Sequence, residues 1–445
     1  MGFNVVYVPV GANTYVLDTM QAMMDRSAEL LRSICPEAFI PSKMLLTNDV
    51  LQEWLDSTNP DLIIFQNLAF ANGTYITEII RRYSCPVIIW SLREPVSNGG
   101  RLELNSLTGA FSAAHTIRNT DNRPYEYVFG CPDEADVKNR LISFLEAAKV
   151  KKEMRHLRMV SVGQSPAGFG FCRALDSELM LKFGVILETA EVRELIEKAR
   201  SYSIEKVEEY KKIACGATCG LDTVANKNVE AFVRQYRAYD EYVKEHGIGA
   251  VASRCWPECF SYYGTPTCPV LSMLNTTGIP AACEDDVYGA LSMWVGVQLS
   301  GEPSFFGDPI CLNEKDNTIT YWHCGMGACS LARKDTGAQI GLHPNRFVGP
   351  VMDFACEPCE GATIFRIGRE PDGSFRFFIA EGTAPDVPKQ YIGTSFTVKT
   401  DNPCRDIIEK AVMDGFEPHF AVVRGRHGKT LEVLAHMLEC KIYNY

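Results

Sequence analysis

Short, continuously apolar runs alternate with helical patterns over the first 150 residues, and this alternation constrains the fold more than any other feature. The runs are bounded by turn residues and comprise Phe3–Val10, Asp61–Gln66, Pro86–Leu92 and Tyr125–Gly130. Amphipathic stretches such as Thr14–Ser33 and Tyr75–Tyr83 lie between them. Strands that are apolar throughout are buried on both faces, so the pattern predicts a doubly wound parallel sheet with helices on both sides.

The pattern starts again at Met159–Gln164 and then changes at Ser304. Beyond Ser304, glycine, proline and short alternating runs dominate, which is typical of β-structure. We therefore predict two doubly wound, flavodoxin-like α/β domains followed by a β-rich C-terminal domain. The predicted limits are 1–156 for the first domain, 157–302 for the second and 303–445 for the third.

The charge balance bears on the partners of the chain. The formal net charge is -11 and the pI is about 5.4, whereas nucleic acids and anionic membranes require a basic surface. No apolar run approaches the roughly 18 residues of a membrane span, and no leader pattern precedes the first strand. We therefore expect a cytoplasmic protein that contacts neither nucleic acid nor membrane.

The 17 cysteines are scattered, and their number is odd. In an intracellular chain this pattern favours reduced, mostly buried thiols over a disulfide framework. Cys356 and Cys359 have the spacing of half a zinc ribbon, but a ribbon needs a second such pair.

Two acids and two histidines in distinctive settings are candidates for chemistry. Glu284 follows a run of small residues and is expected to open a helix, where a carboxylate is favoured. Asp308 lies between Gly307 and Pro309, His323 ends an alternating run, and His427 has glycine neighbours. Each is by itself also compatible with an ordinary turn, cap or strand-end role. Together they form a carboxylate and imidazole set that suits a divalent cation such as manganese.

These segments resemble those of the L-fucose isomerase / L-arabinose isomerase superfamily, in particular its fucose-isomerase-like branch. The resemblance covers the whole chain in its domain layout. It is clearest in five segments: Glu284–Leu291, Gly307–Pro309, Trp322–Gly325, Arg426–Lys429 and Arg101–Leu107.

The resemblance implies a metal-dependent aldose–ketose isomerase that works through a cis-enediol. By position it implies Glu284, Asp308 and His427 as ligands of Mn²⁺ or another divalent cation, at the junction of the second and third domains. His323 is implied as a ligand or as a substrate contact, because the branches differ there. Glu284 and Asp308 are also the expected catalytic acids. Which of them removes the proton from carbon stays open.

The implied substrate is a free monosaccharide. Hexoses, 6-deoxyhexoses, pentoses and 6-substituted hexoses, including a sulfonated one such as sulfoquinovose, are all compatible. Trp256 and Glu258 are candidate sugar contacts, since an indole face packs against sugar C–H groups. Arg93 is a candidate to bind an anionic substituent of the sugar, because its planar guanidinium group matches the geometry of oxyanions.

The resemblance also implies a homo-oligomer in which the first domain of a neighbour closes the active site, so that Arg93 would act in trans. The alternative function is a non-catalytic sugar-binding or regulatory protein of the same fold. A nucleotide-dependent oxidoreductase is disfavoured, because Gly163–Gly170 has neither the Walker lysine nor the dinucleotide fingerprint. We expect that segment to be a strand-end turn that lines a pocket.

Overall fold

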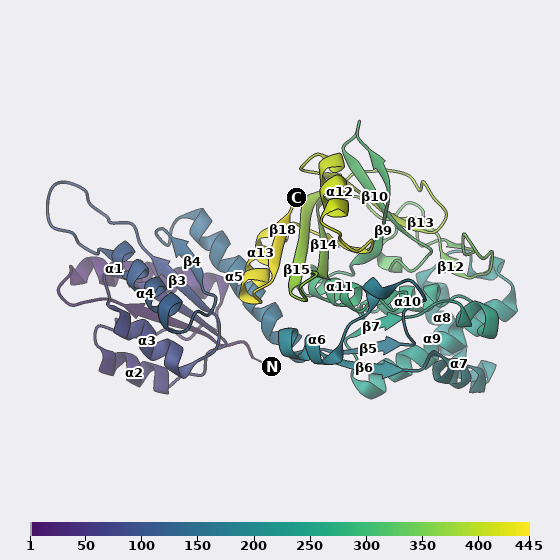
Figure 1. The fold of residues 1–445 in the computed structure, drawn as a ribbon, viewed down its shortest axis with the longest axis horizontal. Helices are drawn as coiled ribbons and strands as arrows, with labels where there is room; N and C mark the ends of the chain where they lie inside the picture. Colours follow the sequence, from purple (N-terminus) through teal and green to yellow (C-terminus); the bar gives the residue numbers. More distant parts are fainter. Residues whose placement is uncertain (1) are drawn as a thin grey trace. The chain divides into compact units, whose positions relative to one another are not determined.

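The computed structural model describes residues 2–445, and these form two compact units (Figure 1). The smaller unit runs to Lys152 and includes Glu432–Glu439. The larger unit contains Glu153–Leu431 and Cys440–Tyr445. The predicted limit between the second and third domains falls inside this larger unit, so the three-domain division remains a prediction.

The smaller unit is built on a parallel sheet with strands in the order β1-β2-β3-β4. One sheet face packs against α2, α3 and α4 through apolar side chains such as Val8, Phe65 and Ile76. On the other face, Gln66 of β2 donates a hydrogen bond to Ser27 of α1. The predicted covering of both faces is therefore confirmed. The elements are β1 (Val5–Val10), α1 (Leu17–Ile34), α2 (Asn48–Asp56), β2 (Leu62–Asn67), α3 (Gly73–Arg82), β3 (Val87–Ser91), α4 (Ser106–Thr120), β4 (Glu126–Phe129) and α5 (Ala135–Met154).

The reversal of strand order expected of a doubly wound sheet comes from a rudimentary strand after α1. Phe39 and Leu45 form isolated parallel bridges with Val6 and Val10 on the free edge of β1. The chain therefore first turns back to one side of β1 and then continues on the other side through β2, β3 and β4.

The larger unit begins with a second parallel sheet, whose order is β6-β5-β7-β8. Here the reversal is complete, and the loops after β5, β7 and β8 meet at the carboxyl edge, where such sheets bind ligands. The elements are β5 (Arg158–Val162), α6 (Asp176–Phe183), β6 (Ile186–Ala190), α7 (Val192–Ser201), α8 (Ile204–Ala217), α9 (Asn226–His246), β7 (Ala250–Ser253), α10 (Cys268–Thr276), β8 (Ala281–Cys283) and α11 (Val287–Ser300).

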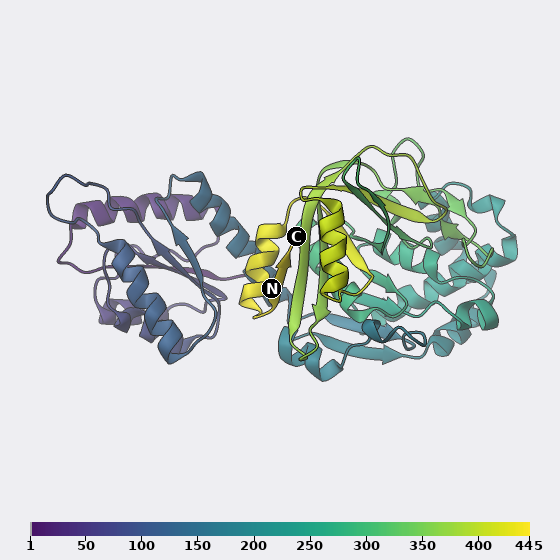
Figure 2. The same ribbon diagram turned by 45° about the horizontal axis from the view of Figure 1, so that its top comes forward.

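The β-rich remainder closes into a barrel. Strands β16, β10, β9, β17, β14 and β15 pair in that order, and an additional pairing of β15 with β16 joins the two ends. Figure 2 shows these yellow-green strands packed along the teal helices of the same unit. The elements are β9 (Phe305–Asn313), β10 (Thr318–His323), β11 (Ile340–Gly341), β12 (Val351–Met352), β13 (Phe354–Ala355), β14 (Cys359–Arg369), β15 (Phe375–Ala384), β16 (Thr394–Thr400), α12 (Cys404–Met413), β17 (Phe420–Arg424) and β18 (Lys441–Asn444). Helix α13 (Gly428–Met437) lies between β17 and β18 in the chain, and most of it belongs to the smaller unit.

Helix α11 joins the second sheet to the barrel. It packs against β7 and β8 on one side and against β14 and β17 on the other. Its ten residues from Val287 to Gly296 are buried all round, as expected for a helix between two apolar layers. In the part of the chain that the structure describes, no helix is both long and apolar enough to cross a membrane.

Candidate active site

Glu284 lies in the turn between β8 and α11 and not in the helix, which corrects the expectation that it opens a helix. Both Glu284 and Asp285 have left-handed backbone conformations, with φ of 59° and 57°. The helix begins at Val287, and the Asp286 carboxylate caps it by accepting a hydrogen bond from the Gly289 N–H at 2.8 Å. Non-glycine residues rarely adopt this conformation, and two in succession mark a site held by its surroundings.

Asp308 and His419 are brought together by strand pairing in the barrel. Phe420 of β17 pairs with Gly307 of β9, so the residues next to them, His419 and Asp308, lie side by side. The His419 Nε2 atom is 3.4 Å from Asp308 Oδ1 and 3.1 Å from Glu284 Oε2. Two acids predicted from separate motifs therefore meet at one imidazole.

A buried ion pair fixes the orientation of this imidazole. Asp286 Oδ2 lies 2.8 Å from His419 Nδ1, and the Asp286 carboxylate accepts two hydrogen bonds from Arg366, at 2.6 and 3.0 Å. The side chains of Asp286 and Arg366 are fully buried. Because Nδ1 donates to Asp286, Nε2 is directed at Glu284 and Asp308.

The electrostatic environment shifts the pKa values of Asp308 and Glu284 in opposite directions. Burial raises the pKa of Asp308 to about 6, with the Glu284 charge adding to this and the His419 charge opposing it. Burial also acts to raise the pKa of Glu284, but the hydrogen bond and the charge of His419, with a hydrogen bond from Trp256, outweigh it, and that pKa is lowered. Burial acts in the same way on Asp286, yet Arg366 and His419 hold its pKa at about 2.

His323 faces the same cluster with a defined proton position. Its Nδ1 accepts a hydrogen bond from the Cys324 N–H at 2.9 Å. Its Nε2 is buried and has no hydrogen-bond partner among residues 2–445. Burial lowers the pKa of His323 to about 4, so the ring is neutral at pH 7 and its single proton lies on Nε2. Candidate ligand atoms of Glu284, His323 and His419 lie within 4.8 Å of one another.

Aromatic side chains enclose the cluster. Trp256, in the loop after β7, has its Nε1–H 3.3 Å from Glu284 Oε1. The segment after β5 brings the Phe169 ring to 5.8 Å from Trp256 and the Phe171 ring to 5.5 Å from His419. This is the Gly163–Gly170 turn and its continuation, which contacts Trp256 and His419 through these two rings; that it lines a pocket stays a prediction.

The structure does not bring His427 into this cluster. His427 follows the far end of β17, whereas His419 precedes its near end. At about 3.3 Å per residue, the five residues of the strand separate the two histidines by roughly 16 Å. The His427 Nε2 atom lies 2.9 Å from the Arg424 carbonyl oxygen, to which it donates. The histidine beside both acids is His419.

Two further predicted sugar contacts have other partners. Glu258 pairs with Arg254 at 2.6 Å. Arg93 belongs to the smaller unit, where its fork donates two hydrogen bonds to Glu134, at 2.7 and 2.8 Å.

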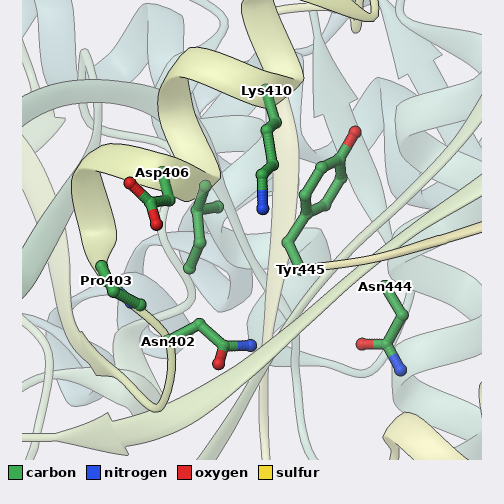
Figure 3. A pocket seen from close by; sticks show the side chains of 7 residues that line it. Asn402, Pro403, Asp406, Lys410, Asn444 and Tyr445 are labelled. Atoms are coloured by element: carbon green, nitrogen blue, oxygen red, sulfur yellow. The ribbon is translucent and has the colours of Figure 1, made fainter.

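A cavity of about 90 Å³ opens beside Glu284 and His323. Its other lining residues are Trp256, Phe260, His343, Asn345, Arg346 and four cysteines, Cys255, Cys268, Cys283 and Cys324. A larger cavity of about 200 Å³ lies between α12 and the C-terminal residues, where Figure 3 shows Asp406, Lys410 and Tyr445. That cavity has one carboxylate and no imidazole in its lining, so it lacks the donors of the cluster.

His419, Asp286 and Arg366 were not identified as functional from the sequence. His419 starts a short alternating run and has no distinctive neighbours. Only the register of β17 with β9 places His419 beside Asp308. These strands are far apart in the sequence, so no local pattern reveals their pairing.

Known proteins resemble the chain over its whole length, although no family model matches it. It is 52% identical over 443 residues to a sulfoquinovose isomerase of Clostridium sp. (strain MSTE9), which covers 99% of both chains. Sulfoquinovose isomerases of Alkalicoccus urumqiensis and Priestia aryabhattai are 36% and 35% identical, over 98% and 99% of each chain. The prediction of an isomerase is confirmed, and the chain belongs to the sulfoquinovose isomerase family.

Proposed function

We propose that the protein interconverts sulfoquinovose, a 6-sulfonated aldohexose, and the corresponding 2-ketose, with a divalent cation such as Mn²⁺ bound by Glu284, Asp308 and His419. The observation that carries the proposal is the meeting of both acids at His419 Nε2, within 3.4 Å. The names of the relatives support the substrate and favour turnover over a non-catalytic sugar-binding protein.

The donor set fits such a cation. Two carboxylates and one imidazole are ligands that Mn²⁺ accepts. Asp286 orients His419 from behind, an arrangement common around metal-binding histidines. His323 is less suited to be a ligand, because its Nε2 carries the proton. We therefore assign His323 to the substrate, as a hydrogen-bond donor to a sugar oxygen.

When bound, the cation would polarise the sugar carbonyl and stabilise negative charge on its oxygen. Glu284 and Asp308 are the groups of this chain that transfer protons between the two reacting carbons and their oxygens. A bound cation would lower the pKa of a carboxylate ligand, so the acid that removes the carbon-bound proton must bind the cation weakly or through a single oxygen. Trp256 and Phe169 cover the cluster and limit the access of water.

The test is exchange of the C2 proton of sulfoquinovose with D₂O, followed by NMR with and without Mn²⁺. We expect exchange and ketose formation in the wild type, and loss of both in Glu284→Gln and Asp308→Asn variants that remain folded. Full exchange in both variants would refute the assignment of the acids. Exchange of unsulfonated hexoses at an equal rate would refute the substrate.

We also propose that the active protein is a homo-oligomer. A cavity of about 90 Å³ is well below the roughly 300 Å³ or more of typical small-molecule sites, so a further surface is needed to enclose a hexose. Mass photometry tests the assembly. Mixing inactive Arg93→Ala and Glu284→Gln proteins tests whether Arg93 acts in trans, because mixed assemblies would then regain activity.

A further inference from the structure

A structured hairpin tip lies at the cavity beside Glu284. Strands β11 and β12 pair antiparallel, and the segment between them closes on His343. The His343 N–H donates to the Val348 carbonyl at 2.9 Å, and the His343 carbonyl accepts from the Phe347 N–H at 2.8 Å. The His343 Nδ1 atom accepts from the Asn345 N–H at 3.2 Å. His343 itself is buried, so the tip holds Arg346 on an anchored turn.

Arg346 is the only lysine or arginine among the residues that line this cavity. Its guanidinium carbon lies 5.8 Å from the centre of the Phe260 ring, which packs edge-on against His343 at 5.1 Å. Within residues 2–445, no carboxylate forms an ion pair with Arg346. Arg93 and Arg254, in contrast, are held by Glu134 and Glu258. The positive charge of Arg346 is therefore available to a ligand.

The lining of the cavity also contains one acid, Glu284. Asp308 does not line the cavity but approaches the same His419 Nε2 atom as Glu284. The protein as a whole also carries a net charge of -11. The proposed cation would offset the two carboxylates at the reacting end of the sugar, so a sulfonate at the other end still needs a cationic partner of its own.

We propose that Arg346 binds the sulfonate of the substrate and selects sulfonated over neutral sugars; this rests on the proposed function. A guanidinium donates two parallel hydrogen bonds to an oxyanion, which a sulfonate accepts through its oxygens. The side-chain amide of Asn345, on the same tip, is a second donor in reach of the cavity. In this arrangement the acids and His419 handle the first two carbons, and Arg346 holds the far end of the six-carbon chain.

The test compares Arg346→Gln and Arg346→Lys with the wild type on two sugars, sulfoquinovose and its neutral counterpart 6-deoxyglucose. We expect Arg346→Gln to lower kcat/KM for sulfoquinovose by about 10- to 100-fold, mainly through KM, because a charge-assisted hydrogen-bond pair is lost. Proton exchange of 6-deoxyglucose should stay within about twofold, and Arg346→Lys should retain part of the activity. Arg405→Gln is the matched control, because Arg405 is exposed on α12 and pairs with Glu314 and Glu409.

An equal loss on both sugars, or no loss on either, would overturn the proposal. Calorimetric binding of the two sugars to Mn²⁺-loaded protein provides a readout that does not need turnover. If the wild type isomerises neither sugar, the proposed function fails. The role of Arg346 is then decided by binding: weaker binding of the sulfonated sugar alone to Arg346→Gln supports it, and unchanged binding refutes it.

Discussion

Replacing Asp286 with asparagine tests how far a buried charge controls the reactive cluster. Asp286 accepts from both Arg366 and His419 in a fully buried setting. Breaking a buried ion pair by removing one partner costs about 3–5 kcal/mol. Asparagine keeps one acceptor for Arg366 and is an equally good helix cap for α11. We therefore expect Asp286→Asn to lower the free energy of unfolding by about 3 kcal/mol, the lower end of that range.

The effect on the site is separate from this loss of stability. An asparagine amide can donate to His419 Nδ1, which leaves the proton of a neutral imidazole on Nε2, the atom that the cation would need. Loss of such an orienting partner typically lowers metal affinity by about 10- to 100-fold. We expect Asp286→Asn to show both the lower unfolding free energy and the weaker Mn²⁺ binding.

Urea unfolding in EDTA measures the first effect, and calorimetric Mn²⁺ titration of the folded variant measures the second. Glu417→Gln is the matched control, because Glu417 pairs with buried Arg376 in the same unit and is not part of the cluster. The control should lose stability while its Mn²⁺ affinity is unchanged. If Asp286→Asn were destabilised but bound Mn²⁺ as tightly as the wild type, the orienting role of Asp286 would be refuted.

Three further outcomes are expected. His419→Gln should abolish proton exchange while His427→Gln retains it, and the reverse result, measured by NMR, would restore His427 as the ligand. Removal of Mn²⁺ with EDTA should abolish exchange. Re-addition at about 100 times its dissociation constant should raise the free energy of unfolding by about 2.7 kcal/mol, and no change in the urea midpoint would argue against a bound cation. The hydrogen bond to Glu126 raises the pKa of His436. The stabilisation of the folded protein by this pair should therefore be complete below the pKa of His436 in the unfolded chain, about 6.5, and be lost as pH rises through its pKa in the folded protein. The stability difference between wild type and His436→Gln, which is under about 1 kcal/mol for such an exposed pair, should therefore shrink as pH rises above about 6.5. A difference that grows with pH would contradict this.

The sequence predicted the parallel sheets well because their strands are continuous apolar runs. Phe3–Val10 and Pro86–Leu92, for example, correspond to β1 and β3 within two residues. Strand β8 was missed, because it consists of only Ala281, Ala282 and Cys283 and small residues carry little strand signal.

The structure brings together some of the residues that the sequence singled out, while their roles stay predictions. Glu284 and Asp308 stand in recognisable local contexts, and the structure brings both to one place. Whether His419 or His427 lies beside the two acids depends on which end of β17 pairs with β9. No local sequence pattern carries that information. Arg366, a buried arginine in the middle of an apolar strand, is explained only by its partner Asp286, which lies 80 positions away in the chain.

The division of the cluster between sheet and barrel has a consequence during synthesis. Domains form as the chain emerges, N-terminal parts first. A nascent chain that has completed the second sheet already presents Glu284, but Asp308 is added later and His419 close to the end. A chain that stops before His419 lacks one of the three proposed ligands, so we expect the proposed cation site to form only after β9 and β17 have paired.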